Sequence, residues 1–183
     1  YTGRVSYIKG IHILVKAIEI LINEINNIKV IIIGSLSDQY GFDTDKTVYA
    51  KKILDSSKKL PIIFKGFISN KNENFKKYLS ASDVFILPSL FENQANSVLE
   101  ALAMNLPVIS SSTGGTGPII NKDVGLLFNT GDYKALASHI KYLWENPKLL
   151  ESMREKSREH IKNAYTWEKS VMKHVYEFNK LLQ

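Results

Sequence analysis

The stretch VFILPSLFENQANSVLEALAM, residues 84–104, decides the fold class of this chain. Residues 84–87 form a short apolar run with no polar alternation, which is typical of a strand buried on both faces of a parallel sheet. Pro88-Ser89 closes that run, and residues 97–104 predict a helix. A buried strand, a short loop and a helix form the repeating unit of doubly wound α/β sheets.

The same unit recurs before and after this stretch. Residues 11–25 place apolar side chains at the i, i+3, i+4 and i+7 spacing of an amphipathic helix. Further apolar runs predict strands at 29–33, 61–64, 108–110 and 125–128, and helical stretches are expected at 48–54 and 75–79. Short loops between these elements predict right-handed βαβ crossovers and a doubly wound, Rossmann-like parallel sheet over residues 1–131.

Only helices are predicted for residues 132–183, with expected ranges of 133–144, 147–162 and 167–182. Pro147 stands at a position where helices often begin with proline, and Asn146 is its predicted N-cap. Trp167 and Tyr176 of the last helix are expected to pack into the core. Because charges of both signs mix on this segment, it indicates a solvated helix face, not a surface for nucleic acid.

Composition narrows the class of protein. The 183 residues, 44% hydrophobic and 23% charged, predict one globular domain over residues 1–183. Zero cysteines exclude disulfides, thiolate zinc sites and cysteine nucleophiles, and no apolar run approaches the roughly 18 to 20 residues that cross a bilayer. The net charge of +6 favours anionic partners. Since Tyr1 follows no initiator methionine or leader, we expect a piece of a longer polypeptide.

Two cations precede the first predicted helix. In a doubly wound sheet, ligands bind beyond the carboxyl ends of the strands, so the loops that follow strands are the places to search. Gly3-Arg4 and Lys9-Gly10 put a guanidinium and an ammonium five residues apart at a helix N-terminus, where both could bind a diphosphate. The alternative from spacing alone is a pair of unrelated surface cations.

Two carboxylates, Glu92 and Glu100, follow the strand at 84–87, one in the loop and one in the helix. Carboxylates accept strongly from vicinal hydroxyls, so this pair suits a sugar or a ribose. The alternative is an ordinary glutamate stabilised by the helix dipole.

Glycine turns close the other predicted strands. Gly34-Ser35 would let a ligand approach the backbone, and Gly66-Phe67-Ile68 could offer a shelf for a nucleobase, although Phe67 could equally be a core residue. The turn Gly114-Gly115-Thr116-Gly117-Pro118, in which Pro118 would open a short helix, suits a phosphate but lacks the spacing of a P-loop or a dinucleotide site.

Taken in order, these motifs resemble family 4 GT-B glycosyltransferases, and specifically the C-terminal, nucleotide-sugar-binding half of that fold. The resemblance spans the whole chain. It rests on Gly3-Arg4 with Lys9-Gly10, the strand ending at Gly34, Phe64-x-Gly66, DVFILPS at 83–89, Glu92-x7-Glu100, EALA at 100–103, PVIS at 107–110 and Gly114-Gly115. Two positions depart from the pattern: Ala95 stands where many members have glycine, and Pro118 stands where many have glutamate.

The resemblance implies a role for each matching residue. Arg4 and Lys9 would bind the donor diphosphate and stabilise the leaving nucleoside diphosphate, and Glu92 would contact the transferred sugar. Glu100 would bind the ribose, and Ile68 would lie near the base. The implied catalytic residues are Arg4, Lys9 and Glu92; the implied donor-binding residues are Gly3, Gly34, Gly66, Ile68, Ser89, Asn93, Gln94, Ala95, Val98 and Glu100.

The family further implies a retaining transfer that needs no metal or other cofactor. The expected partners are a nucleotide sugar and a glycan or lipid-linked acceptor, the latter bound by an N-terminal domain absent from this chain, with no nucleic acid. The chain alone would therefore transfer nothing. The expected location is cytoplasmic, with peripheral attachment to the inner face of the membrane compatible with the net charge.

Competing interpretations stay open. A sugar-nucleotide epimerase of the same architecture and a non-catalytic anion-binding module are the alternative functions. Asp43-Thr44-Asp45 matches a metal-binding D-x-D, but Asp45 is more simply read as a helix N-cap. The four histidines lack the spacing of a metal site or of a histidine general base.

Overall fold

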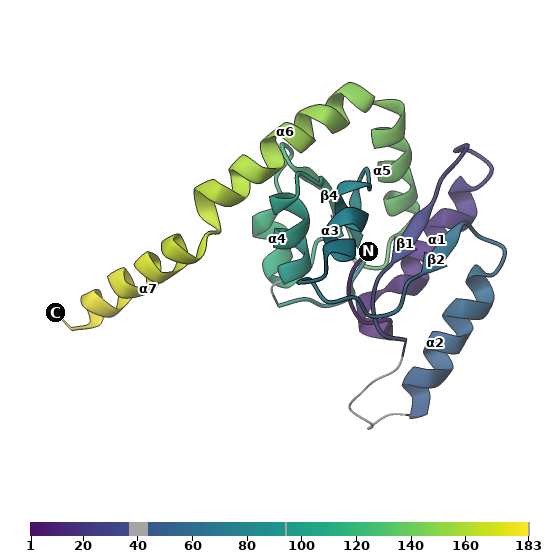
Figure 1. The fold of residues 1–183 in the computed structure, drawn as a ribbon, viewed down its shortest axis with the longest axis horizontal. Helices are drawn as coiled ribbons and strands as arrows, with labels where there is room; N and C mark the ends of the chain where they lie inside the picture. The colour runs from purple at the N-terminus through teal and green to yellow at the C-terminus, as the bar shows by residue number, and fades with distance from the viewer. Residues whose placement is uncertain (37–43, 94, 183) are drawn as a thin grey trace.

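Within residues 1–36, 44–93 and 95–182, which this computed structural model describes, five short parallel strands form two sheets (Figure 1). One sheet pairs β1 (Val30–Ile32) with β2 (Ile62–Phe64), and the other has the order β3 (Phe85–Leu87), β4 (Val108–Ser111), β5 (Gly125–Phe128). All three pairings are parallel, with Ile31 opposite Ile63 and Ile109 between Ile86 and Leu126. The predicted α/β class with parallel strands is confirmed.

Helices connect and follow these strands, as predicted. They are η1 (Tyr7–Lys9), α1 (Ile11–Leu21), α2 (Thr44–Ser57), α3 (Glu73–Ser80), α4 (Asn96–Ala103), η2 (Gly114–Ile119), α5 (Tyr133–Glu145), α6 (Pro147–Ala164) and α7 (Trp167–Leu181). None of the helices in the described part of the chain is long and apolar enough to cross a membrane.

Several predicted helix ends were wrong. α1 stops at Leu21 instead of running to residue 25, because a turn follows in which Asn27 takes a left-handed backbone. α2 already begins at Thr44, which places Asp45 inside the first turn and not at the cap, while Asp43 lies outside the described residues. Asn146 is the N-cap residue of α6, as predicted, but its side chain makes no capping hydrogen bond, since its amide nitrogen donates to the carbonyl of Tyr142 instead.

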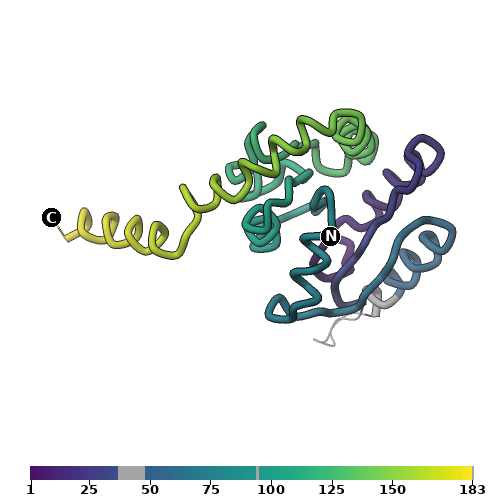
Figure 2. The backbone as a smooth tube through the Cα atoms, turned by 45° about the horizontal axis from the view of Figure 1, so that its top comes forward, coloured from purple at the N-terminus to yellow at the C-terminus, as the bar shows by residue number. Residues whose placement is uncertain are grey.

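The N-terminal residues extend the first sheet. Thr2 forms a parallel bridge with Ile33, the amide of Gly3 donates to the carbonyl of Ile33 at 2.9 Å, and the amide of Ile33 donates to Tyr1 at 3.0 Å. In Figures 1 and 2 the N-terminus lies between the group of β1, β2, α1 and α2 and the group of α3 and α4. This short segment therefore lies beside the end of β1 and leads directly to Arg4.

β3 and β4 are buried, whereas β2 is partly exposed. All three residues of β3 and all four of β4 are buried, as a strand covered on both faces requires. β2 was predicted to be equally buried, but Ile63 is exposed. β2 has only β1 as a neighbour, so it forms an edge of its sheet. On the helical side, α1 buries Ile11, Leu14, Ile18 and Leu21 almost completely.

The last helix is not part of the core. Figures 1 and 2 show α7 extending away from the α/β body. Trp167 is 85% exposed and Tyr176 is 60% exposed, so the prediction that both pack into the core was wrong. The physical cause is a break at Thr166, whose extended backbone redirects the chain and whose side chain caps the new helix by accepting from the amide of Lys169.

Gly10 lets the turn before α1 lie directly on the loop after β3. Its φ is 67°, and a Cβ built there would lie 1.9 Å from the carbonyl oxygen of Pro88. The amide of Leu90 also donates to Ile8 at 2.7 Å across the same contact. Gly66 has the same φ of 67°, but its Cβ would meet nothing within 4 Å.

We predict that Gly66→Ala lowers the free energy of unfolding by about 1 kcal/mol, the cost of a left-handed backbone for a side-chain-bearing residue. Gly10→Ala adds an overlap with backbone that cannot move aside, so we expect a loss of about 3 kcal/mol or more. Urea denaturation of both variants measures the difference. Equal losses would show that the Gly10 to Pro88 approach is not a constraint.

An aromatic cluster joins α2 to α1. The rings of Tyr7 and His12 stack at 4.8 Å, and the backbone amide of His12 donates to the Tyr49 hydroxyl at 3.1 Å. The Nδ1 atom of His12 lies 2.9 Å from the same hydroxyl. Burial lowers the pKa of His12 from its ordinary value of 6.5, and the positive charge of Lys16 lowers it further. His12 is therefore held as neutral imidazole.

A lowered histidine pKa makes stability depend on pH in one direction. Below about pH 6.5 the unfolded chain takes up a proton at His12 more readily than the folded chain, so stability is lost as pH falls through the pKa of the folded state. We predict that His12→Phe, which keeps a ring beside Tyr7, flattens the loss of stability between about pH 7 and 5. Thermal denaturation across this range is the measurement, and His174→Phe, on exposed α7, is the control. Identical slopes for His12→Phe and the wild type would contradict the assignment.

Candidate functional site

Backbone contacts tie together the loops that leave the carboxyl ends of the strands. Leu90 bonds to Ile8 at 2.7 Å, and the amide of Gly115 donates to Asn93 at 2.6 Å. Gly34 and Gly114 make close approaches, since a Cβ at Gly34 would collide with the carbonyl oxygen of Gly3, and one at Gly114 with that of Glu92. These contacts join the loops that hold the predicted site residues into one connected region. The region lies at the carboxyl ends of the strands, where doubly wound sheets bind ligands.

Lys9 and Glu92, predicted from distant parts of the sequence, meet at this edge. The Nζ atom of Lys9 lies 2.5 Å from Oε1 of Glu92, and the side chains are 23% and 8% exposed. Ser89, which is fully buried, donates from its hydroxyl to the same Oε1 atom at 2.8 Å. A carboxylate this desolvated needs such partners, because an unpaired buried charge costs several kcal/mol. Lys9 is therefore not an unrelated surface cation, which was the alternative interpretation from its spacing.

Arg4 is exposed on the segment that follows the Thr2 bridge. Its carbonyl accepts from the Tyr1 hydroxyl at 2.8 Å. Burial raises the pKa of the Tyr1 phenol and the negative charge of Glu92 raises it further, while the positive charge of Arg4 opposes this rise. The charges of both Arg4 and Glu92 therefore act on the Tyr1 phenol.

Glu100 lies on α4 and connects to the loop after β2. Its Oε1 atom accepts from the amide nitrogen of Asn70 at 2.9 Å. Half-buried Ile68, predicted to lie near the base, is in that same loop. Phe67 beside it is 76% exposed, so the alternative interpretation of Phe67 as a core residue was wrong. Sequence reasoning missed Asn70, whose only signal was an amide in a loop that follows a strand.

The other predicted donor-binding residues differ in their exposure. Asn93 is exposed, whereas Ala95 and Val98 are buried, and the amide of Val98 already donates to the carbonyl of Ala95. Gln94 lies outside the described residues. The turn at Gly114 forms the 3-10 helix η2, in which Pro118 lies inside the helix and does not open it.

Two buried serines at the end of β4 were also missed. The hydroxyl of Ser111 donates to the carbonyl of Ser89 at 2.5 Å, and that of Ser110 donates to Leu87 at 3.2 Å. Both bonds run from β4 to β3 or to the loop beyond it. The signal was a pair of serines closing an otherwise apolar strand, where hydroxyls can bond only to a neighbouring backbone.

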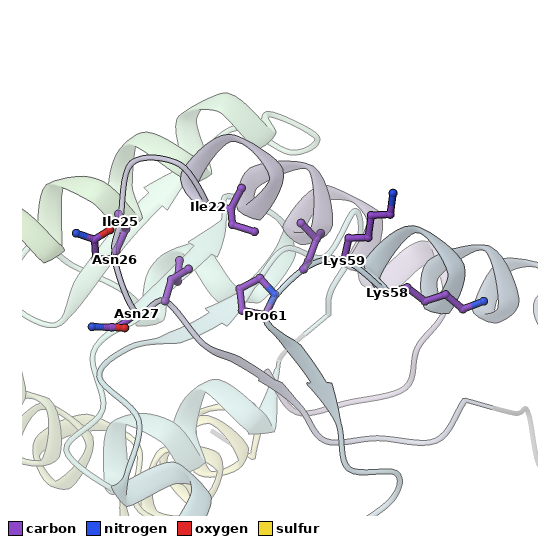
Figure 3. Close-up of a pocket in the computed structure, with 9 residues that line it drawn as sticks. Ile22, Ile25, Asn26, Asn27, Lys58, Lys59 and Pro61 are labelled. Atoms are coloured by element: carbon purple, nitrogen blue, oxygen red, sulfur yellow. The ribbon is translucent and has the colours of Figure 1, made fainter.

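The described residues contain no candidate metal site. No group of three or more histidine, aspartate or glutamate side chains lies together there. A pocket of about 450 Å³ (Figure 3) lies before β1 and β2, at their amino ends, and contains no predicted site residue. It is lined by Ile22, Ile25, Asn26, Asn27, Ile28, Lys58, Lys59, Leu60 and Pro61.

Three comparisons relate the chain to known proteins. It is 28% identical over 171 residues to the capsular polysaccharide biosynthesis glycosyltransferase CapM of Staphylococcus aureus, covering 91% of this chain and 41% of that protein. The structure of sucrose-phosphate synthase from Thermosynechococcus elongatus superposes with a TM-score of 0.80 and 25% identity over 98% of this chain and 44% of that one. That of Anabaena HepE in complex with UDP-glucose has a TM-score of 0.75 and 21% identity, over 88% and 43%.

The chain thus spans less than half the length of each of these proteins. The family model for glycosyl transferases group 1 matches residues 1–160, from the segment before Arg4 to the end region of α6. This range includes every residue of the candidate site. The chain therefore belongs to the glycosyl transferases group 1 family.

Proposed function

We propose that this chain binds a nucleoside-diphosphate sugar and is the donor-binding half of a retaining, metal-independent glycosyltransferase. The observation that carries the proposal is the contact of Lys9 with buried Glu92 at the carboxyl edge of the sheet. Cations suit the diphosphate and a carboxylate suits the sugar hydroxyls, so one small region offers both kinds of group.

The charge that builds up on the leaving diphosphate would be stabilised by Arg4, Lys9 and the N-terminus of α1. α1 begins at Ile11, directly after Lys9-Gly10. The positive end of the α1 helix dipole adds to the attraction of the two side-chain cations for phosphate oxygens. In this proposal these groups take the charge-stabilising role that a metal ion takes in other transferases.

Glu100 would accept from the ribose hydroxyls and Glu92 from the transferred sugar. Glu100 lies on α4 beyond the loop that holds Glu92, and Asn70 links it to the loop of Ile68, where we place the base. The complex of HepE with UDP-glucose supports a uridine nucleotide sugar as the first ligand to test.

Sugar transfer would require the remaining part of the protein. The chain covers 41% of CapM, whose name assigns it to capsular polysaccharide biosynthesis. We therefore propose that the acceptor, a glycan or a lipid-linked sugar, is bound outside these 183 residues, and that the chain alone binds the donor without transferring the sugar.

Calorimetric titration with UDP-sugars and GDP-sugars tests the proposed function. We predict that Arg4→Ala and Glu100→Ala each weaken binding about tenfold or more, because each removes a hydrogen bond to or from a charged group. Arg158→Ala, which removes an exposed arginine from α6, is the matched control and should bind like the wild type. No binding by the wild type, or binding unchanged by both substitutions, would refute the site.

A further inference from the structure

We propose that Ser89 is a positioning residue for Glu92 and does not itself bind the donor. The proposal rests on the proposed function and refines it, because Ser89 was expected among the donor-binding residues. A serine hydroxyl has one proton to donate, and that of Ser89 is directed to Oε1 of Glu92 at 2.8 Å. The side chain is also completely buried, so a phosphate or sugar cannot reach it.

Ser89 is held firmly enough to act as a support. Its carbonyl accepts from the hydroxyl of Ser111, at the end of β4. β4 is the central strand of its sheet, with Ser111 paired to Phe128 of β5 and Ser110 paired to Leu87 of β3. The chain of bonds from Ser111 through Ser89 to Glu92 therefore connects the carboxylate to the most buried part of the sheet.

This support matters because Lys9 is a partner that the donor would remove. In the structure Lys9 and Ser89 both donate to Oε1 of Glu92. A diphosphate that attracts the Lys9 ammonium would weaken that contact and leave a largely buried carboxylate. The hydroxyl of Ser89 would then keep Oε1 in place, so that Oε2 is the oxygen that we expect to accept the sugar hydroxyl.

The inference predicts that loss of the Ser89 hydroxyl weakens binding of the sugar part of the donor and leaves binding of the nucleotide part nearly unchanged. We compare the affinity for a nucleotide sugar with that for its nucleoside diphosphate, using UDP-glucose and UDP first, or the UDP-sugar or GDP-sugar that the wild type binds most tightly. Ser89→Ala should lower the ratio of the two affinities about tenfold, equivalent to about 1.4 kcal/mol. Binding of the diphosphate alone should change less than about threefold, within the range of an indirect effect.

Matched variants separate positioning from folding. Thr113→Ala removes a hydroxyl that bonds to Leu90 in the same loop at 3.4 Å, and it should leave the ratio unchanged. Ser89→Thr keeps the donating hydroxyl and should restore the ratio even if the added methyl lowers stability, whereas Ser89→Cys, a weak donor, should not. In a Glu92→Gln background, Ser89→Ala should lower the ratio much less than it does alone, since the two changes act on one interaction.

The possible results distinguish a failure of the proposed function from a failure of the role of Ser89. A wild type that binds neither nucleotide nor nucleotide sugar refutes both the proposed function and the role of Ser89. Wild-type binding that depends on Arg4, together with a ratio unchanged by Ser89→Ala, refutes the role of Ser89 alone. Equal weakening of both ligands by Ser89→Ala would also refute it, because that is the result of a purely structural role.

Discussion

A nearly buried carboxylate, that of Glu92, is the constraint on which the site depends. Removing a carboxylate from water costs several kcal/mol unless charge and hydrogen bonds replace the lost hydration. Lys9 supplies the charge and Ser89 supplies a hydroxyl. Both must come within hydrogen-bonding distance of one oxygen, and this is possible only because the turn before α1 lies against the loop after β3.

That approach depends on glycines at the places where backbones touch. Gly10 meets the carbonyl of Pro88, Gly114 meets that of Glu92, and Gly34 meets that of Gly3. Each contact joins a different pair of loops, and a side chain at any of them would force the loops apart. These three glycines therefore let the loops of the site come together, whereas Gly66, with open space around it, satisfies only its own backbone conformation.

The sequence predicted the strands, their parallel pairing and the charged groups of the site because each has a local signal. Apolar runs mark β3 and β4, Glu92 stands in the loop after β3, and Lys9 ends η1 just before α1. The bond from Ser89 to Glu92 and the bond from Asn70 to Glu100 have no comparable signal, because a serine or an asparagine in a loop suits many local roles. The exposure of β2 likewise depends on its place at the edge of the sheet, which a pattern of apolar residues does not reveal.

The packing of α7 could not be predicted from its sequence pattern either, for a different reason. Its apolar residues follow a helical pattern, and such a pattern predicts that one face of the helix is covered. Yet Trp167, Val171 and Leu182 are more than half exposed, because the break at Thr166 turns the helix away from the sheet. The pattern identifies an apolar helix face whose exposure to water is unfavourable, but it does not identify the surface that would cover this face. In the site, by contrast, Lys9 and Glu92 were each predicted as site residues, and the structure brings these opposite charges into contact.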